Sequence, residues 1–355
     1  MATAAIDQGK FEALMGKALT DIGGALALLM AHMGDKLGLY RALEAHGPGT
    51  SADIAAKAGL DERYVREWLS GVAAAGYVDY DAADETFSLS PEAALIFAAE
   101  GDPRCLQGFF QAVKSVFDDE EKSTEAIRTG RGLGWGERSP ACFCGTDRFF
   151  RPGYAVNLVD SWIPALTGIE ERLKAGARVA DIGCGHGSST VLMAEAFPNS
   201  TFTGFDFHAP SIEAARAKAQ EAGAGNVSFE VAAAKDFPGE DYDFVCIFDA
   251  IHDMGDPAGA AAHIRRSLKP DGSFMVVEPL AGDTLSDNLH LLGQIFYGFS
   301  TCACVPASKA QEVGLALGAQ AGEQRLAAVL REGGFASVRR AAQTDTNMVL
   351  EARCV

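Results

Sequence analysis

Residues 179–187 read V-A-D-I-G-C-G-H-G, and this stretch decides the fold class. Its β-branched residues favour a short strand, and S-S-T-V-L-M-A-E-A at 188–196 favours a capped helix directly after it. Gly183, Gly185 and Gly187 allow a sharp turn and leave no Cβ where a ligand must come close. A strand, a glycine loop and a helix N-terminus together begin a nucleotide-binding α/β unit.

Two carboxylates indicate what kind of nucleotide this unit would bind. The glycines are spaced G-x-G-x-G with Asp181 two positions before the first, which differs from the dinucleotide fingerprint. A pyrophosphate prefers bare amides and a helix dipole, whereas a carboxylate at this mouth suits a cationic ligand that carries an amine. Asp206 ends the next predicted strand, 201–205, where an acid that accepts both ribose hydroxyls is expected. For the loop alone, a purely structural turn is the alternative.

Three later segments extend the pattern. Predicted strands at 227–231 and 242–248 are each followed by a polar loop. L-K-P-D-G at 268–272 predicts a turn into a strand at 273–277, which ends at Glu278. In this order and spacing, D-I-G-C-G-H-G, G-F-D-F, D-Y-D-F-V and L-K-P-D-G resemble the class I S-adenosylmethionine-dependent methyltransferases.

This resemblance covers residues 165–355 and implies the fold and the cofactor. The fold class would be α/β, with a seven-stranded Rossmann-like sheet closed by an antiparallel pair at 338–340 and 347–351. The cofactor would be S-adenosyl-L-methionine, and the product S-adenosyl-L-homocysteine. The loop would hold the methionine part and Asp206 the ribose. Many members have an acid after the third strand that meets the adenine amine, whereas this chain has Ala233 and Ala234 there.

The resemblance therefore implies a set of cofactor-binding residues around the loop and the strand ends. They are Asp181, Gly183, Gly185, Gly187, Ser188, Ser189, Asp206, Phe207, Lys235, Asp236, Phe248, Asp249 and, from an earlier helix, Tyr154.

The N-terminal hundred residues form a separate predicted domain, 1–100. Residues 11–45 are helical and apolar on most faces, and an all-round apolar helix must be buried. We expect burial against a second copy of the chain, hence a homodimer. A central helix covered within one subunit would show the same sequence pattern. Helices at 50–58 and 61–75 and a hairpin of 77–80 with 86–89 then resemble a winged-helix domain.

Charge argues against nucleic acid and membranes as partners. Arg63 and Arg66 could face phosphates, but Asp61, Glu62 and Glu67 share their helix, and the formal net charge of the chain is -18. A dimerisation and lid module, as in small-molecule O-methyltransferases, fits this composition better than a DNA reader. We find neither a signal-peptide pattern nor a charge-free membrane span, so a cytoplasmic location is expected.

Two segments are predicted to wall a substrate pocket. The connecting segment 101–164 is rich in aromatic residues, Trp135 among them, although ordinary interdomain packing would also use aromatics. An insertion follows the fifth strand at 279–322, and in the resembled superfamily an insertion there covers the substrate. Substrate contacts are accordingly expected from Trp135, His290, Tyr297 and Cys304.

His252 is the candidate base for the acceptor proton. Its segment I-H-D-M-G-D-P resembles the H-D-W-x-D segment of small-molecule O-methyltransferases, whose histidine takes that proton. An ordinary pKa near 6.5 would leave His252 mostly neutral, and Glu278 or Asp253 could orient it. A purely structural role in the loop remains open.

The expected function is methyl transfer to a small molecule, most readily at a hydroxyl oxygen. A thiol, an amine or a metalloid acceptor is the alternative, and a winged-helix regulator that senses the cofactor is an alternative of another class. Eight cysteines without a disulfide pattern indicate reduced thiols. The pairs Cys142 with Cys144 and Cys302 with Cys304 leave open a four-thiolate zinc site, against the simpler reading as apolar fillers. No metal ligand is therefore assigned.

Overall fold

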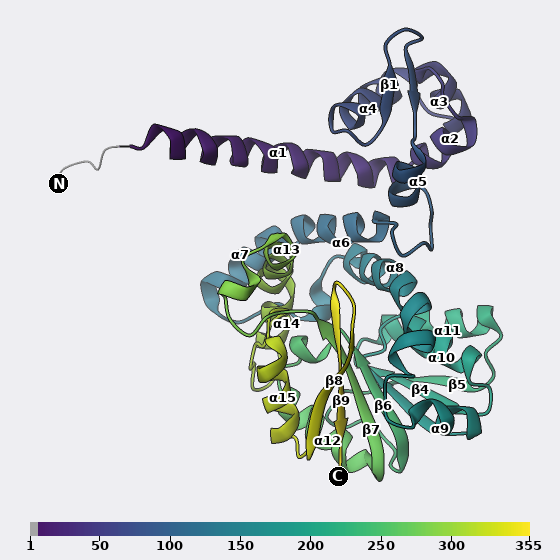
Figure 1. Cartoon of the computed structure of the whole chain (residues 1–355), viewed down its shortest axis with the longest axis vertical. Coiled ribbons are helices and arrows are strands. Elements are labelled where there is room, and N and C mark those ends of the chain that lie inside the picture. The colour runs from purple at the N-terminus through teal and green to yellow at the C-terminus, as the bar shows by residue number, and fades with distance from the viewer. Residues whose placement is uncertain (1–5) are drawn as a thin grey trace. The chain divides into compact units, whose positions relative to one another are not determined.

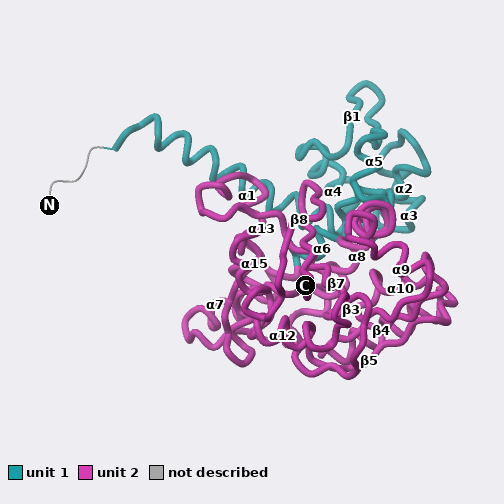
Figure 2. Tube along the Cα trace, turned by 60° about the horizontal axis from the view of Figure 1, so that its bottom comes forward, with its two compact units in different colours: residues 1–114 teal, residues 115–355 magenta. Residues whose placement is uncertain are grey.

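This computed structural model describes residues 6–355, which form two compact units that divide between residues 114 and 115 (Figure 2). The first unit is helical with one small hairpin, and the second is built on a seven-stranded sheet (Figure 1). Each unit has its own hydrophobic core, and each is described below by itself.

The N-terminal unit has the helices and hairpin of a winged-helix domain, as predicted. Local signals set their boundaries: Thr50 and Asp53 form a capping box at α3, and the Asp61 side chain accepts from Tyr64 N at 3.3 Å to begin α4. The elements are α1 (Gln8–Lys36), α2 (Leu39–His46), α3 (Ser51–Ala58), α4 (Glu62–Ala74), β1 (Asp79–Asp81), β2 (Thr86–Ser88), α5 (Pro91–Phe97) and α6 (Gln107–Asp118), which crosses the division.

Aromatic rings fill the core of this unit. Tyr40 packs edge-on against Trp68 and stacks on Phe97, with ring centroids 5.1 and 4.9 Å apart. The Trp68 indole donates to the Met30 carbonyl at 2.8 Å, which ties α4 to the end of α1. Gly34 makes this approach possible, because a Cβ there would stand 2.2 Å from the Trp68 ring.

Helix α1 departs from the predicted all-round apolar helix. Most of its large apolar side chains are exposed in the single chain, and seven of them follow one stripe with spacings of three or four residues. The stripe consists of Phe11, Met15, Leu19, Ile22, Leu26, Leu29 and Met33. By length and composition alone α1 could also cross a membrane, with 6% of the relevant window buried. The helical region is interrupted at Gly38. This residue has a left-handed φ of 70° and is the N-cap of α2.

The C-terminal unit contains the predicted seven-stranded sheet, in the order β5-β4-β3-β6-β7-β9-β8. The first four pairings are parallel, and β9 runs antiparallel to both of its neighbours. The strands are β3 (Arg178–Ile182), β4 (Thr201–Asp206), β5 (Val227–Val231), β6 (Tyr242–Phe248), β7 (Leu268–Pro279), β8 (Ser337–Gln343) and β9 (Asn347–Arg353).

Helices cover both faces of this sheet (Figure 1). Alternate strand residues point to the two faces, so that Ile247 packs with α12 and α15 while Cys246 packs with α9 and α10. The helices are α7 (Glu120–Thr129), α8 (Pro140–Asn157), α9 (Ile169–Ala175), α10 (Ser188–Ala196), α11 (Ala209–Ala222), α12 (Pro257–Ser267), α13 (Leu291–Phe299), α14 (Val305–Lys309) and α15 (Gly322–Glu332). Short 3₁₀ or π turns are η1 (Trp135–Glu137), η2 (Leu158–Trp162), η3 (Ile251–Asp253), η4 (Ser286–Asn288) and η5 (Ser300–Cys304).

The predicted turn at L-K-P-D-G is a bulge inside β7 instead. Tyr242 pairs with Leu268 and Phe244 with Ser273, so the residues between are looped out of the ladder. Pro270 has no N–H to give to such a ladder, which explains why the segment bulges although the strand continues.

Candidate active site

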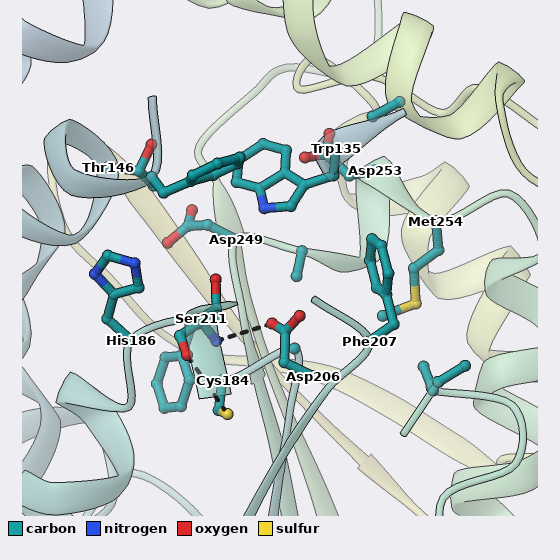
Figure 3. A pocket seen from close by; sticks show the side chains of 18 of the residues that line it. Trp135, Thr146, Cys184, His186, Asp206, Phe207, Ser211, Asp249, Asp253 and Met254 are labelled. Atoms are coloured by element: carbon teal, nitrogen blue, oxygen red, sulfur yellow. Dashed lines mark hydrogen bonds between the residues drawn. The ribbon is translucent and has the colours of Figure 1, made fainter. Parts of the chain in front are cut away.

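A cavity of about 440 Å³ opens at the carboxyl ends of the parallel strands, where ligands bind in open α/β sheets (Figure 3). The glycine loop, the ends of β4 and β6, and α8 supply most of its wall. Asp206, Asp249 and Trp135 are among the residues that line it.

The glycine loop has the predicted backbone, but its three glycines have different roles. Gly183, Gly185 and Gly187 all have positive φ, at 69°, 52° and 75°. A Cβ on Gly185 would meet nothing within 4 Å, so this residue leaves space toward the cavity. A Cβ on Gly187 would instead stand 2.7 Å from the Phe229 ring. The missing side chain of Gly187 thus lets α10 approach Phe229 of β5 and Ala215 of α11 closely.

Asp206 lies where a ribose-binding carboxylate is expected, and the backbone fixes it there. Its Oδ2 accepts from Gly185 N at 3.0 Å, and its Oδ1 accepts from His208 N at 2.8 Å. Burial raises the pKa of Asp206, against these two amide hydrogen bonds. Both oxygens retain lone pairs, and the residue lines the cavity.

Asp181 lies beneath the loop and is fully buried. Its Oδ2 accepts from Ser189 Oγ and Thr190 Oγ1, each at 2.7 Å. Its Oδ1 accepts no hydrogen bond of normal geometry within residues 6–355, and burial raises its pKa to about 6. An orphaned carboxylate oxygen under this loop fits a ligand that carries positive charge.

Helix α10 begins without the predicted side-chain cap. Gly187 is its N-cap, and the nearby serines are engaged elsewhere: Ser189 binds Asp181, and Ser188 Oγ donates to Asp147 Oδ1 at 2.5 Å. Lys218 Nζ also binds Asp147 Oδ1, at 2.9 Å, and contacts Ser188. The sequence analysis did not predict Asp147. Its hydrogen bond with Ser188 links α8 to the start of α10, and it lines the cavity.

Asp249 has a left-handed backbone conformation in the cavity wall. Its φ is 48° although it is not glycine, and its oxygens accept from Tyr154 Oη at 3.2 Å and from Asn347 Nδ2 at 2.8 Å. Burial, with the Glu278 carboxylate next in importance, raises the pKa of Asp249 to about 8. Burial also raises the pKa of Tyr154 well above its ordinary value.

His252 lies behind the cavity wall between two carboxylates. Its Nδ1 bonds to Glu278 Oε2, and its Nε2 lies 3.2 Å from Asp253 Oδ1. Glu278 in turn accepts from Ile251 N at 2.9 Å. Burial alone would lower the pKa of His252, but Glu278 and then Asp253 outweigh it, so the pKa is raised well above 6.5. The two neighbouring carboxylates therefore favour the charged imidazole, whereas the sequence analysis expected a mostly neutral one.

Aromatic rings form one wall of the cavity. Trp135 packs against Phe143 with centroids 5.4 Å apart, and Phe150 stacks on Tyr154 at 5.9 Å. All four line the cavity. Lys235 and Glu312, both wall residues, form an exposed ion pair at the rim. The wall thus contains both aromatic rings and several carboxylates.

The cavity brings together most of the expected cofactor-binding residues. Those that line it are Tyr154, Gly183, Gly185, Ser188, Ser189, Asp206, Phe207, Lys235, Phe248 and Asp249. Asp181 and Gly187 lie behind the wall, and Asp236 is exposed to solvent outside it.

The expected substrate residues are more scattered. Trp135 lines the cavity, but His290 does not: its Nδ1 accepts from Gly293 N at 3.2 Å and caps α13. Tyr297 is half-buried on α13, and Cys304 is buried in η5 beside His252. From the insertion, the wall includes Ala307, Gln311 and Glu312, which no sequence motif singled out.

The two cysteine pairs do not form a four-thiolate site within the described residues. All eight cysteines are free, with Cys142 buried and Cys144 exposed. The metal-ligand group that residues 6–355 do offer contains one cysteine, Cys304, with His252 and Asp253.

Two family models match this chain. Residues 173–332 match the one described as a methyltransferase domain, and residues 24–98 match the Rv2258c-like winged helix-turn-helix domain. Together they account for the sheet with its cavity and for the N-terminal helices with their hairpin.

Among curated relatives, the chain is 30% identical over 199 residues to nocamycin O-methyltransferase of Saccharothrix syringae, covering 54% of this chain and 67% of that protein. It is 33% identical over 118 residues to the 27-O-demethylrifamycin SV methyltransferase of Amycolatopsis mediterranei, covering 31% of this chain and 43% of that protein.

Solved structures share the fold over nearly the whole chain. The mitomycin 7-O-methyltransferase MmcR superposes with a TM-score of 0.70 at 19% identity, over 97% of this chain and 99% of that one. Human N-acetylserotonin methyltransferase, solved with S-adenosylmethionine, gives 0.71 at 16% identity, over 99% of both chains.

Proposed function

Because this chain belongs to the S-adenosylmethionine-dependent methyltransferases with an N-terminal winged-helix domain, we propose that it methylates a hydroxyl oxygen of a small, largely apolar acceptor. One observation carries this proposal: an aromatic wall and Asp253, the carboxylate next to Nε2 of the buried His252, line the same cavity as the glycine loop. An aromatic wall binds a flat apolar molecule, and the histidine provides for a proton that a hydroxyl must lose.

The residues of the cavity fit S-adenosylmethionine. Asp206 has free lone pairs for a ribose diol, Gly185 leaves open space beside it, and Asp181 beneath the loop supplies negative charge for a cationic ligand. When bound there, the cofactor supplies an electrophilic methyl group. The contribution of the chain is to orient the two ligands and exclude water, since methyl transfer is a direct displacement.

His252 accepts the acceptor's proton in this proposal, and Glu278 is a positioning residue. The bond from Nδ1 to Glu278 leaves Nε2 as the nitrogen that faces Asp253, and Asp253 lines the cavity. Since both carboxylates favour the charged imidazole, the reactive form is the one from which that proton has left. Transfer to a hydroxyl is accordingly expected to become faster as pH rises through the raised pKa of His252.

The charge of the cavity supports a neutral or cationic acceptor. Its wall includes the carboxylates of Asp147, Asp206, Asp249, Asp253, Asp256 and Glu312. The lysine of the wall, Lys235, is already paired with Glu312. An anionic acceptor such as a carboxylic acid would be repelled. A thiol or an amine remains the alternative, and a methyl-transfer screen over phenols, thiols, amines and carboxylic acids separates these classes.

We place two copies of the chain in the working enzyme, located in the cytoplasm. The apolar stripe on α1 has the spacing of three or four residues that is typical of a helix packed along another helix, whereas lipid would contact all sides. Lys17 and Asp21 form an ion pair on the same helix, which a membrane would have to bury. A second copy offers the complementary stripe.

The winged-helix domain serves assembly rather than DNA binding in this proposal. Arg63 pairs with Glu67 at 2.6 Å and Arg66 with Glu62 at 3.1 Å, so each arginine of α4 already faces a carboxylate. The alternative, a regulator that senses the cofactor, predicts a salt-sensitive gel shift with double-stranded DNA, and its absence at moderate salt would set that alternative aside.

The decisive experiment is calorimetry of the purified chain with S-adenosylmethionine and with S-adenosylhomocysteine. We expect both to bind, and Asp206→Asn to weaken both by about ten- to a hundredfold, because a charged acceptor of hydrogen bonds is worth about 1.5–3 kcal/mol. Asp236→Asn is the matched control, since Asp236 is exposed outside the cavity and should leave the affinity unchanged. Undiminished affinity in Asp206→Asn would overturn the assigned site.

A further inference from the structure

Residues 311–318 form a strap that packs on the segment 252–256 at the edge of the cavity. The Gln311 side chain accepts from Gly255 N at 3.1 Å, and Leu315 N donates to the Gly255 carbonyl at 2.9 Å. A Cβ on Gly255 would stand 2.5 Å from Gln311 Cβ, so the two segments are in direct contact. The strap is therefore anchored to the cavity wall near both of its ends.

The backbone of the strap is strained. Four of its residues have a positive φ between 53° and 73°, and they are Val313, Gly314, Ala316 and Gly318. Glycine takes such values at little cost, whereas a β-branched residue with a positive φ is an outlier. Strain of this kind persists only where the surrounding structure enforces it, and it is common in segments that clamp ligands. Val313 is 69% exposed, so its own side chain contributes little to holding the strap in place.

The tip of the strap, residues 312–314, has few bonds to the rest of the chain. No N–H group of the tip donates a hydrogen bond within residues 6–355, whereas Ala316 N, just after it, donates to Ser308 Oγ at 2.9 Å. An ion pair connects the tip to the opposite wall, from the Glu312 carboxylate to the Lys235 ammonium group. Both side chains are exposed, at 75% and 44%, and an exposed ion pair is weak and sensitive to salt.

This ion pair joins two separate parts of the wall on the side where a nucleoside base would lie. Lys235 follows β5, which pairs with β4, and Asp206 is the last residue of β4. The order β5-β4-β3 places the glycine loop on the other side of Asp206 from Lys235. A ligand with its amino-acid part at the loop and its ribose at Asp206 therefore extends its base toward Lys235. Lys235 and Glu312 both line the cavity.

We propose that Lys235 and Glu312 are positioning residues that hold the strap closed over the nucleoside side of the cavity, and that the tip moves away when their ion pair breaks. The inference rests on the proposed cofactor site, but not on the acceptor or on the role of His252. A strained tip with few bonds leaves its closed position readily, and a weak ion pair suits a contact that must break each time a ligand enters or leaves.

Such a role changes rates more than affinity. The ion pair is present in the free chain and would form again over the bound ligand, so its loss should speed entry and release alike and nearly cancel in Kd. A lysine that binds the ligand directly would behave differently, because its loss would speed release alone and raise Kd.

Stopped-flow fluorescence with S-adenosylhomocysteine tests this without an acceptor, with Trp135 of the cavity wall as the reporter. This ligand has no net charge at neutral pH, so attraction by the acidic chain contributes little to its rates. We expect Glu312→Gln to raise both the association and the dissociation rate about two- to fivefold, with Kd within about twofold of wild type. Added salt should speed both rates in the wild-type chain but not in Glu312→Gln.

Two further variants separate the ion pair from other roles. Glu230→Gln, which removes an exposed carboxylate of β5 outside the cavity, should behave like the wild-type chain. Lys235→Glu should raise both rates, and Lys235→Glu combined with Glu312→Lys should return them to within about twofold of wild type, because the attraction is restored with the charges exchanged.

Three results would contradict the proposal, and they differ from one another. Unchanged rates in Glu312→Gln would show that the ion pair does not control entry. A Kd that is raised in Lys235→Glu and stays raised in the exchanged pair would assign Lys235 to direct contact with the ligand. A wild-type chain that binds no S-adenosylhomocysteine would overturn the assigned cofactor site, and the role of the strap with it.

Discussion

At the scale of single residues, the charge of His252 is the property that the site controls. Its imidazole is buried, and burial alone would favour the neutral form. Glu278 on Nδ1 and Asp253 near Nε2 reverse this preference. Both carboxylates therefore favour the charged imidazole, and a protonated His252 must lose its proton before it can accept one.

Replacing Asp253 by Asn should therefore lower the pKa of His252. Asn keeps the shape but removes the negative charge next to Nε2, so the charged imidazole loses one of its two stabilising partners. We expect a fall of about 1 unit or more, measured by NMR of the ring protons between about pH 5 and 10. Glu312→Gln, a change of an exposed carboxylate at the rim, is the control. A His252 titration that did not move in Asp253→Asn would assign the whole effect to Glu278.

The sequence predicted residues that follow from strand geometry and missed those that depend on distant packing. Asp206 could be placed because it ends a strand next to the glycine loop, where parallel strands present their side chains to one edge. Asp147 could not, because it belongs to α8 and meets Ser188 only after the chain has folded. His290 was expected at the substrate, but it caps α13, a role that local hydrogen bonding decides.

At the scale of elements, the contact of α1 with α4 depends on the missing side chain of Gly34. A Cβ there would stand 2.2 Å from Cζ2 of Trp68, whose indole also donates to the Met30 carbonyl. Gly34→Ala should therefore destabilise the chain by about 1–3 kcal/mol despite the better helix propensity of alanine. The measurement is urea unfolding followed by fluorescence.

Gly16→Ala on the same helix is the matched control for this change. Nothing lies within 4 Å of a Cβ at Gly16, so only the propensity gain of about 0.5–1 kcal/mol should remain. Equal effects of the two substitutions would mean that α1 does not pack on Trp68 in solution.

Element types were more predictable than element details. Both winged-helix helices begin near the predicted residues because Thr50 and Asp61 are strong N-caps that act locally. The turn predicted at L-K-P-D-G became a bulge in β7, because pairing with Tyr242 extends the strand back to Leu268. That pairing is a tertiary interaction, and no local sequence pattern predicts it.

At the scale of the whole molecule, the exposed stripe on α1 should decide the oligomeric state. Ile22 and Leu29 are 59% and 41% exposed in the single chain and lie on this stripe. Light scattering after gel filtration should give twice the mass of one chain, and Ile22→Lys with Leu29→Lys should give a single chain, because buried lysines cost more than the interface gains. Lys10→Glu, on the same helix but off the stripe, should stay dimeric.

Two results would contradict this assembly. A wild-type chain that is monomeric at micromolar concentration would remove the second copy as the occupant of the stripe. Flotation of the wild-type chain with lipid vesicles, lost in the double variant, would assign α1 to a membrane instead.

Helix α8 carries Phe143, Phe150 and Tyr154 of the aromatic wall, and two of its side chains bind neighbouring elements. Asp147 holds the start of α10, and Tyr154 donates to Asp249 at the end of β6. Asp147 and Tyr154 line the same cavity as the glycine loop, so we expect a ligand bound at the loop to affect α8 and with it the position of Phe143 and Phe150. The two reactants should consequently enter in a compulsory sequence, with the nucleoside first, and initial-rate kinetics should report an ordered scheme rather than a random one.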